Sequence, residues 1–342
     1  DVTINQISHD FYFGANGFML QGFKDSKENV LYEKNFTQLF NLVTVPFFWP
    51  ALEPEPGKLR FGKESEYIYR RPAPDVVLDF CKKNNITPKG HTLIWDNPRG
   101  GLPTWLEKDE NAIEKKTNKR IDEIAERYRY DIGIWDVANE VTDRHSDVIM
   151  PKDFAYKAFK ESERVFPGST LFTLNFTTAI WYRANKREYS ADYLLIDNLM
   201  RRNAKLDVIG MQFHNFNENE YWRILKGELL TPEVMFNTLD LYSDFNLPIH
   251  ITEITLAGLS DKGEEYQATM AENYYKLWFS HPKVEAIIWW NMVDGTAAPA
   301  GVNPDGSLMP GEDKWKGGLL RRDFSEKPSF KVLDRLINHD WK

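Results

Sequence analysis

The sequence predicts an α/β protein built as a single (β/α)8 barrel, with one domain over residues 1–342. Short β-rich runs alternate with amphipathic stretches along the whole chain. Apolar runs of this length joined by helices are typical of parallel strands that are covered on both faces. No stretch rich in Pro, Gly and Ser divides the chain, which favours one closed barrel over two doubly wound halves.

The strands and helices can be placed in order along the chain. Eight strands are predicted, at residues 11–16, 42–46, 88–95, 132–138, 171–175, 208–213, 248–252 and 286–290. Helices are predicted at residues 74–84, 118–130, 151–166, 190–203, 231–245, 264–280 and 327–337. The clearest helix start is Thr231-Pro232-Glu233, where a capping residue precedes a proline and an acidic side chain that favours the helix dipole.

Composition excludes several classes of protein. No apolar run reaches the 18 or so residues that a membrane-spanning helix needs, so no membrane span is predicted. A formal net charge of −8 argues against a nucleic-acid partner, which would require a basic stripe. The single cysteine, Cys81, excludes a disulfide framework and a multi-cysteine metal site. Neither the glycine-rich dinucleotide fingerprint nor a P-loop motif occurs.

Aromatic residues are abundant, with 11 Trp, 15 Tyr and 22 Phe. They are explained either by a large core alone or by a core together with stacking platforms for flat ligands such as sugar rings. Trp95, Trp289 and Trp290 lie at strand ends, where an indole face could stack on a sugar. Consecutive residues of a strand point to opposite sides, so we expect Trp290 to face the barrel axis and Trp289 to be buried against a helix.

Two glutamates close predicted strands. In a barrel of this kind the chemistry lies at the carboxyl ends of the strands. Glu140 ends the fourth strand and Glu253 ends the seventh, so the two should face each other across the barrel mouth. A single glutamate at a strand end more often caps a helix or pairs with an arginine. Together, with Asn139 placed to bond a sugar 2-hydroxyl, they predict the carboxylate pair of a retaining glycosidase, about 5–5.5 Å apart.

Other polar residues at strand ends support this hypothesis. His214 is expected to orient Glu253, and Gln212 and His91 are expected to bond sugar hydroxyls. A strand histidine is more often a satisfied core residue, and that alternative stays open for both histidines. No His-x-x-x-His or Cys/His spacing occurs, so neither a metal nor a cofactor is predicted.

These residues lie in motifs that resemble glycoside hydrolase family 10, the retaining xylanase family. The resemblance covers nearly the whole chain in order. By position it implies that Glu140 is the acid/base and Glu253 the nucleophile. The motifs are Asp10-Phe11-Tyr12-Phe13-Gly14-Ala15, Phe40-Asn41-Leu42-Val43-Thr44, Gly90-His91-Thr92-Leu93-Ile94-Trp95, Trp135-Asp136-Val137-Ala138-Asn139-Glu140, Ile209-Gly210-Met211-Gln212-Phe213-His214 and Ile251-Thr252-Glu253.

The chain departs from this family where the family grips its glycone-side sugars. A usual Pro-Glu-Asn-x-x-Lys is replaced by Val45-Pro46-Phe47-Phe48-Trp49-Pro50, a usual Trp-His by Trp95-Asp96, and a usual Asn-Asp-Tyr-Asn by Leu174-Asn175-Phe176-Thr177. The segment Asp294-Gly295-Thr296-Ala297-Ala298 lacks a second cleft tryptophan. We expect Trp49 and Asn175 to contact substrate. Arg99 either serves a charged or branched substituent or is a plain surface arginine. Because buried polar groups discriminate strongly between substrates, these changes should alter specificity.

The function predicted is a retaining endo-β-1,4-xylanase acting on xylan or decorated xylan. A β-glycosidase or an endo-hydrolase for another β-glycan is the first alternative, and a non-catalytic carbohydrate-binding barrel is the second. A polysaccharide or oligosaccharide partner and a monomeric state are expected. The chain begins at Asp1 without the basic and apolar start of a signal peptide. A secreted, periplasmic or cell-surface location is expected only because polymeric glycans lie outside cells.

Overall fold

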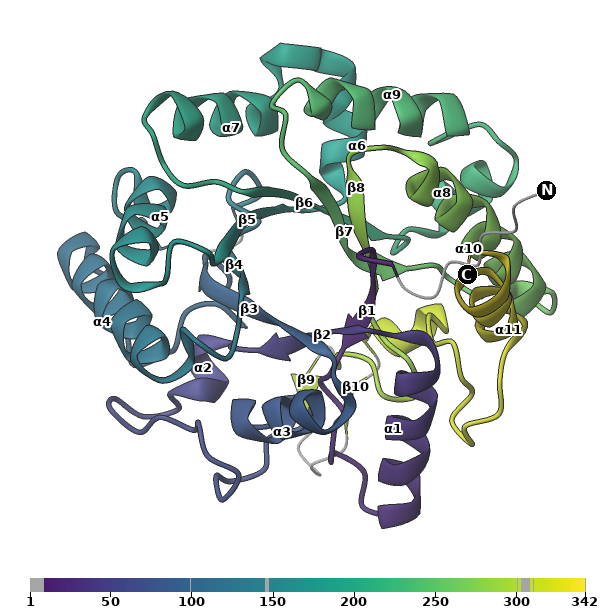
Figure 1. Ribbon diagram of the computed structural model, residues 1–342, viewed down its shortest axis with the longest axis horizontal. Helices are drawn as coiled ribbons and strands as arrows, with labels where there is room; N and C mark the ends of the chain where they lie inside the picture. Colours follow the sequence, from purple (N-terminus) through teal and green to yellow (C-terminus); the bar gives the residue numbers. More distant parts are fainter. Residues whose placement is uncertain are drawn as a thin grey trace, which may run out of the picture.

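The computed structural model describes residues 9–98, 100–144, 148–299, 301–302, 308–309 and 311–341. Within these ranges, parallel strands close into a barrel in chain order, with β8 paired to β1 (Figure 1). The predicted fold class is therefore confirmed, and every predicted strand overlaps an observed one. The strands are β1 (Tyr12–Asn16), β2 (Leu42–Pro46), β3 (Thr87–Trp95), β4 (Ile134–Asn139), β5 (Leu171–Phe176), β6 (Val208–His214), β7 (Ile249–Thr255) and β8 (Val284–Trp289).

Helices surround the barrel as an outer layer (Figure 1). The longer ones are α1 (Ser26–Leu39), α3 (Pro74–Asn84), α4 (Glu110–Tyr128), α5 (Phe154–Val165), α7 (Ala191–Arg201), α9 (Pro232–Ser243), α10 (Gly263–Ser280) and α11 (Pro328–Arg335). Shorter elements in the connections are α2 (Trp49–Leu52), α6 (Ala179–Arg183), η1 (Ala184–Tyr189), α8 (Glu218–Leu225), β9 (Gly301–Val302), β10 (Leu308–Met309), η2 (Glu312–Trp315) and η3 (Leu336–Asp340). That a single domain extends over residues 1–342 stays a prediction, because the described ranges do not reach either end.

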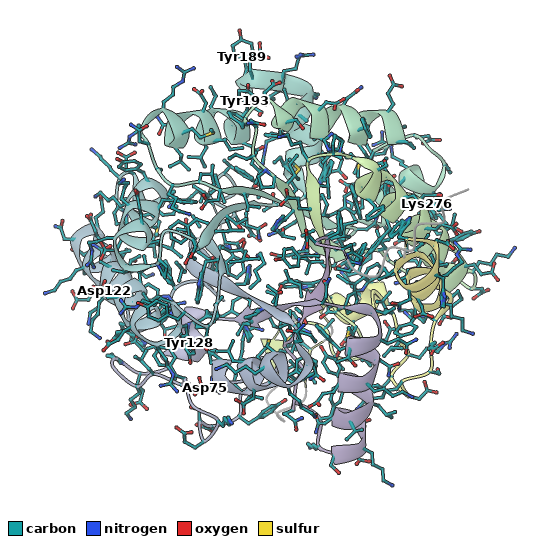
Figure 2. All side chains as sticks on the ribbon, in the orientation of Figure 1. Asp75, Asp122, Tyr128, Tyr189, Tyr193 and Lys276 are labelled. Carbon is teal, nitrogen blue, oxygen red and sulfur yellow. The ribbon has the colours of Figure 1, made fainter. Side chains whose placement is uncertain are left out.

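The strands are covered on both faces. Every residue of β2, β4 and β7 is buried, as expected of parallel strands with side chains inside the barrel and helices outside it. The outer face is held by contacts between neighbouring helices. Figure 2 shows Asp75 of α3 and Tyr128 of α4 close together, and the Tyr128 hydroxyl donates a 2.9 Å hydrogen bond to Asp75. The fold thus places polar side chains at the strand ends on a scaffold that packing keeps rigid.

The short helices α2, α6 and α8 were not predicted, and two of the longer helices also differ from the prediction. Helix α1 was not predicted, because Asn29 and Asn35 occupy two of its five buried positions and interrupt the apolar period. Asp25 caps it by accepting a hydrogen bond from the Lys27 amide. Helix α4 begins at Glu110, eight residues before the predicted start, because its first turns are mostly polar. Its start is set by the Asp109 side chain, which accepts hydrogen bonds from two backbone amides.

Candidate active site

The strands that carry the candidate catalytic residues are irregular where those residues lie. The pairing of β4 with β5 shifts register between Asp136 and Ala138, and that of β6 with β7 shifts between Met211 and Gln212. Bulges of this kind re-aim side chains next to active sites. They occur here immediately before the ends of β4 and β6, where polar side chains gather at the barrel mouth.

Glu253 lies on β7, is only 5% exposed, and is surrounded by nitrogen atoms. Its Oε1 accepts hydrogen bonds from Asn175 Nδ2 at 2.9 Å and from Gln212 Nε2 at 3.2 Å. Its Oε2 lies 3.2 Å from His214 Nε2. Residues from β5 and β6 therefore fix the Glu253 carboxylate in one orientation, as a nucleophile requires.

Glu140 directly follows β4 and is less buried than Glu253. Its backbone is in the left-handed region at φ 56°, and its amide donates to the Asn175 carbonyl oxygen at 2.8 Å. Its side chain accepts hydrogen bonds from Trp95 Nε1 and Gln212 Nε2, both at 3.0 Å. A half-buried carboxyl is suited to exchange protons with a leaving group and with water.

Gln212 bridges the two glutamates. One Nε2 atom lies 3.0 Å from Glu140 Oε1 and 3.2 Å from Glu253 Oε1. These two contacts limit the distance between the two Oε1 atoms to about 6 Å, which is compatible with the 5–5.5 Å that separates the carboxyl groups of retaining enzymes.

A buried polar cluster lies inside the barrel beneath these carboxyls. Asp136 accepts hydrogen bonds from Lys89 and from His91 Nδ1, the latter at 2.8 Å. Burial pushes the Asp136 pKa upward, but the Lys89 charge and the His91 bond outweigh burial and hold that pKa below its usual value. Burial, helped by the Lys89 charge, lowers the pKa of His250 to about 3. His250 is therefore neutral in the folded protein at neutral pH.

A cleft of about 850 Å³ opens beside the two glutamates. Trp95 and Trp290 both line it, and the Trp95 indole N–H is the one that bonds Glu140. Trp289 is fully buried and donates to the Gly317 carbonyl oxygen at 3.0 Å. The structure thus places the two tryptophans on the sides expected from the strand alternation. Aromatic and charged side chains complete much of the lining, namely Phe18, Phe48, Arg70, Arg71, Phe216, Glu312, Lys314 and Trp315.

Two substrate contacts expected from the sequence are placed elsewhere. Trp49 is 2% exposed and packs outside the cleft, with its indole N–H bonded to Glu53 at 2.8 Å, because the chain turns into α2 at this residue. Phe48, one residue earlier, faces the cleft instead. Asn175 is fully buried and bonds Asn139 Oδ1 at 2.8 Å as well as Glu253, so it positions these side chains and does not reach the cleft.

The remaining predicted residues are placed as follows. Asn139 and His91 are each 2% exposed, and His91 Nε2 lies 3.9 Å from Glu253 Oε1. Both are thus close to the carboxyl pair, and their contact with sugar hydroxyls stays a prediction. Arg99 lies outside the described residues. Asp96, which replaces the usual histidine after Trp95, is buried and paired with Arg144.

Several cleft residues were not predicted from the sequence. Phe18, Arg71, Phe216 and Trp315 lie in connections, where neither strand nor helix periodicity indicates direction. Of these four, only Phe216 could have been suspected from the sequence, because it follows His214 by two residues. In the structure the rings of His214 and Phe216 stack, with their centres 4.7 Å apart.

Among the residues that the structure describes, no group of His, Cys, Asp and Glu is arranged to hold a metal ion. Within the same ranges, no helix has the length and apolarity needed to cross a membrane.

The chain matches the model of glycosyl hydrolase family 10 over residues 6–331. The chain belongs to glycosyl hydrolase family 10. Among curated relatives, this family 10 chain is similar to endo-1,4-beta-xylanase A of Caldicellulosiruptor sp. (strain Rt8B.4), at 31% identity over 60% of this chain and 30% of the relative. It is also similar to endo-1,4-beta-xylanase B of Thermotoga neapolitana, at 25% identity over 89% of this chain and 82% of the relative.

The family 10 chain covers less than half the length of three of the curated relatives that it matches. The shares of those relatives that it covers are 30%, 31% and 42%. One of the three is anti-sigma-I factor RsgI6 of Acetivibrio thermocellus, at 26% identity over 76% of this chain. Among solved structures, native xylanase 10B from Thermotoga maritima superposes with a TM-score of 0.73 at 20% identity, covering 97% of this chain and 96% of that one. That likeness shows the shared barrel fold.

Proposed function

We propose that this family 10 chain is a retaining endo-β-1,4-xylanase that acts on xylan or a decorated relative. The observation that carries the proposal is the bridge from Gln212 to both Glu140 and Glu253, which holds two carboxyls at a spacing suited to double displacement. The xylanases among its relatives support xylan as the substrate.

In the first step of this mechanism, Glu253 attacks the anomeric carbon. The glycosidic bond breaks as Glu140 gives its proton to the leaving oxygen, and a covalent glycosyl ester forms on Glu253. In the second step, Glu140 takes a proton from water, the water oxygen bonds to the anomeric carbon, and Glu253 is released. The roles follow the burial of the two groups. Glu253 is buried and held by three side chains, whereas Glu140 is less buried and bonds Trp95, which lines the cleft.

Product analysis tests the proposal. On unsubstituted xylan and glucuronoarabinoxylan, we expect oligosaccharides of several lengths whose new reducing ends are first formed in the β configuration, as NMR can follow. Glu253→Ala serves as the inactive control. Release of single sugars alone would indicate a β-glycosidase. An inactive but folded protein on both polymers would refute the xylanase assignment.

We also propose that the enzyme works outside the cytoplasm, at the cell surface, in a periplasm or in the medium, because a polymeric substrate does not enter cells. Fractionation of the producing cells, followed by detection of the chain in each fraction, tests this location.

We further propose that the enzyme is a monomer and that it needs no cofactor. Light scattering and activity after exhaustive chelation measure these two properties directly.

A further inference from the structure

The cleft carries more positive than negative side chains in a protein whose net charge is −8. Arg70, Arg71 and Lys314 line it, against Glu312 as the one acidic residue among the described residues of the lining. All three cations have contacts within the protein. Arg70 is buried and donates to Asn291 Oδ1 at 2.6 Å, and the Lys314 ammonium lies 4.9 Å from the Trp315 ring.

Arg71 is partly buried, whereas Arg70 is fully buried and Lys314 is exposed. Its guanidinium lies over the Phe48 ring, 3.7 Å from the ring centre, and its Nη1 donates to the Arg70 carbonyl oxygen at 2.8 Å. None of the ion pairs within the described part of the chain includes Arg71. Burial and the neighbouring Arg70 charge lower the Arg71 pKa to about 9, although Glu312 opposes that shift. A planar fork of donors with a single acceptor among the described residues is suited to bind a carboxylate with two hydrogen bonds.

The position of Arg71 is fixed and close to the reacting centre. Arg60 donates hydrogen bonds to backbone carbonyls of the same loop, including that of Glu66 at 3.0 Å. The Phe48 ring beneath Arg71 lies 5.9 Å from the ring of Trp95, which in turn bonds Glu140. A sugar that stacks on Trp95, which is only partly buried, would therefore bring its substituents within reach of the guanidinium.

We propose that Arg71 binds a uronic-acid carboxylate on the substrate, so that the enzyme prefers a β-glycan with acidic substituents. This inference rests on the proposed xylanase function and specifies its substrate class. Desolvation in a cleft with surplus positive charge strengthens the pairing of Arg71 with a carboxylate, and a neutral chain leaves the guanidinium without that partner.

Two forms of one polymer isolate the carboxylate. Glucuronoxylan is compared with the same preparation after its carboxyl groups have been reduced to alcohols, which keeps the backbone and branching unchanged. We expect wild-type kcat/KM to be about tenfold higher on the acidic form, and Arg71→Met to bring the two values together. Arg71→Lys, which keeps the charge but loses the planar fork, should give an intermediate ratio. Exposed Arg201, which lies outside the cleft lining, provides the matched control, and Arg201→Met should keep the wild-type ratio.

The ratio separates recognition from a structural role. If Arg71 only supported Phe48, Arg71→Met would lower kcat/KM equally on both polymers. Mass spectrometry of the products adds a second readout. The uronic acid should lie at a fixed position from the new chain end with the wild type and at variable positions with Arg71→Met. Equal cleavage of the two polymers by the wild type, or a preference that Arg71→Met retains, would overturn the inference and leave the xylanase function standing. No cleavage of either polymer would overturn both.

Discussion

His214 connects Glu253 to Thr255 through its two ring nitrogens. Nε2 lies 3.2 Å from Glu253 Oε2 and Nδ1 lies 2.9 Å from Thr255 Oγ1. If the Thr255 hydroxyl donates to Nδ1, the ring proton resides on Nε2 and is directed at Glu253. Thr255 is 2% exposed and does not line the cleft, so we interpret it as a positioning residue that sets the His214 tautomer.

This interpretation predicts the effect of removing the Thr255 hydroxyl. Thr255→Val keeps the side-chain shape but loses the donor, so we expect kcat to fall about tenfold, while Thr255→Ser stays near the wild type. The ¹⁵N chemical shifts of the His214 ring should report the change of tautomer directly. Unchanged ring shifts and an unchanged kcat in Thr255→Val would contradict the assignment.

The roles of Glu140 and Glu253 can be separated by chemical rescue. Glu140→Ala should lower turnover by at least about 10²-fold through loss of the general acid, and Glu253→Ala by at least as much. With azide and a substrate that has an activated leaving group, Glu140→Ala should give a β-glycosyl azide and Glu253→Ala an α-glycosyl azide. The products are distinguished by NMR, and the reverse pattern would exchange the two roles.

At the scale of elements, α4 holds the last part of β3 and the loop that follows β2. Arg120 of α4 is buried and donates to the carbonyl oxygens of Leu93 and Thr92, each at 3.0 Å, and also to that of Phe47. Burial lowers the Arg120 pKa to about 9. One side chain of a surrounding helix therefore fixes the backbone that presents Phe48 to the cleft.

Arg120→Met should accordingly destabilise the protein. Three buried carbonyl oxygens lose a charged donor, so we expect the free energy of unfolding to fall by about 3 kcal/mol or more. Lys115→Met, an exposed change on the same helix, should alter it by less than about 0.5 kcal/mol. Urea unfolding monitored by tryptophan fluorescence compares the two variants. Equal stability would show that the Arg120 contacts contribute little.

At the scale of the whole molecule, the barrel interior carries charge beneath the site. The pKa of His250 falls from its ordinary value of 6.5 to about 3 on folding, so the unfolded chain binds the proton first as the pH falls. The stability that neutral His250 contributes is fully present above about pH 6.5 and is lost between there and about pH 3. Asp136, with its lowered pKa, acts in the same direction at more acidic pH.

His250→Asn should therefore flatten the acid side of the stability profile. Between pH 6 and 4.5 the wild-type free energy of unfolding should fall by up to about 1.4 kcal/mol per pH unit more than that of the variant. His339 is 69% exposed, and His339→Asn should keep the wild-type slope. Urea titrations at a series of pH values measure the slopes. Parallel profiles for wild type and His250→Asn would refute the role of His250.

The barrel and the closeness of the carboxyls of Glu140 and Glu253 could be predicted from the sequence, because each depends on a local signal. Buried parallel strands need apolar runs, and Glu140 and Glu253 each close such a run. Helix α1 could not be predicted, because its buried Asn29 donates to the Phe23 carbonyl oxygen at 2.8 Å and is thereby satisfied despite its polarity. That hydrogen bond forms only once the chain has folded.

By itself, then, the sequence determined the fold class, the eight strands and the two carboxyls at their ends, since local periodicity encodes all of these. Only the tertiary structure decided which neighbouring side chains enter the cleft. It turned Phe48 inward and buried Trp49, placed Asn175 under Glu253, and set Arg71 on an aromatic ring. Each of these directions depends on residues distant in the chain, because the space available to a side chain is defined by the elements that pack around it.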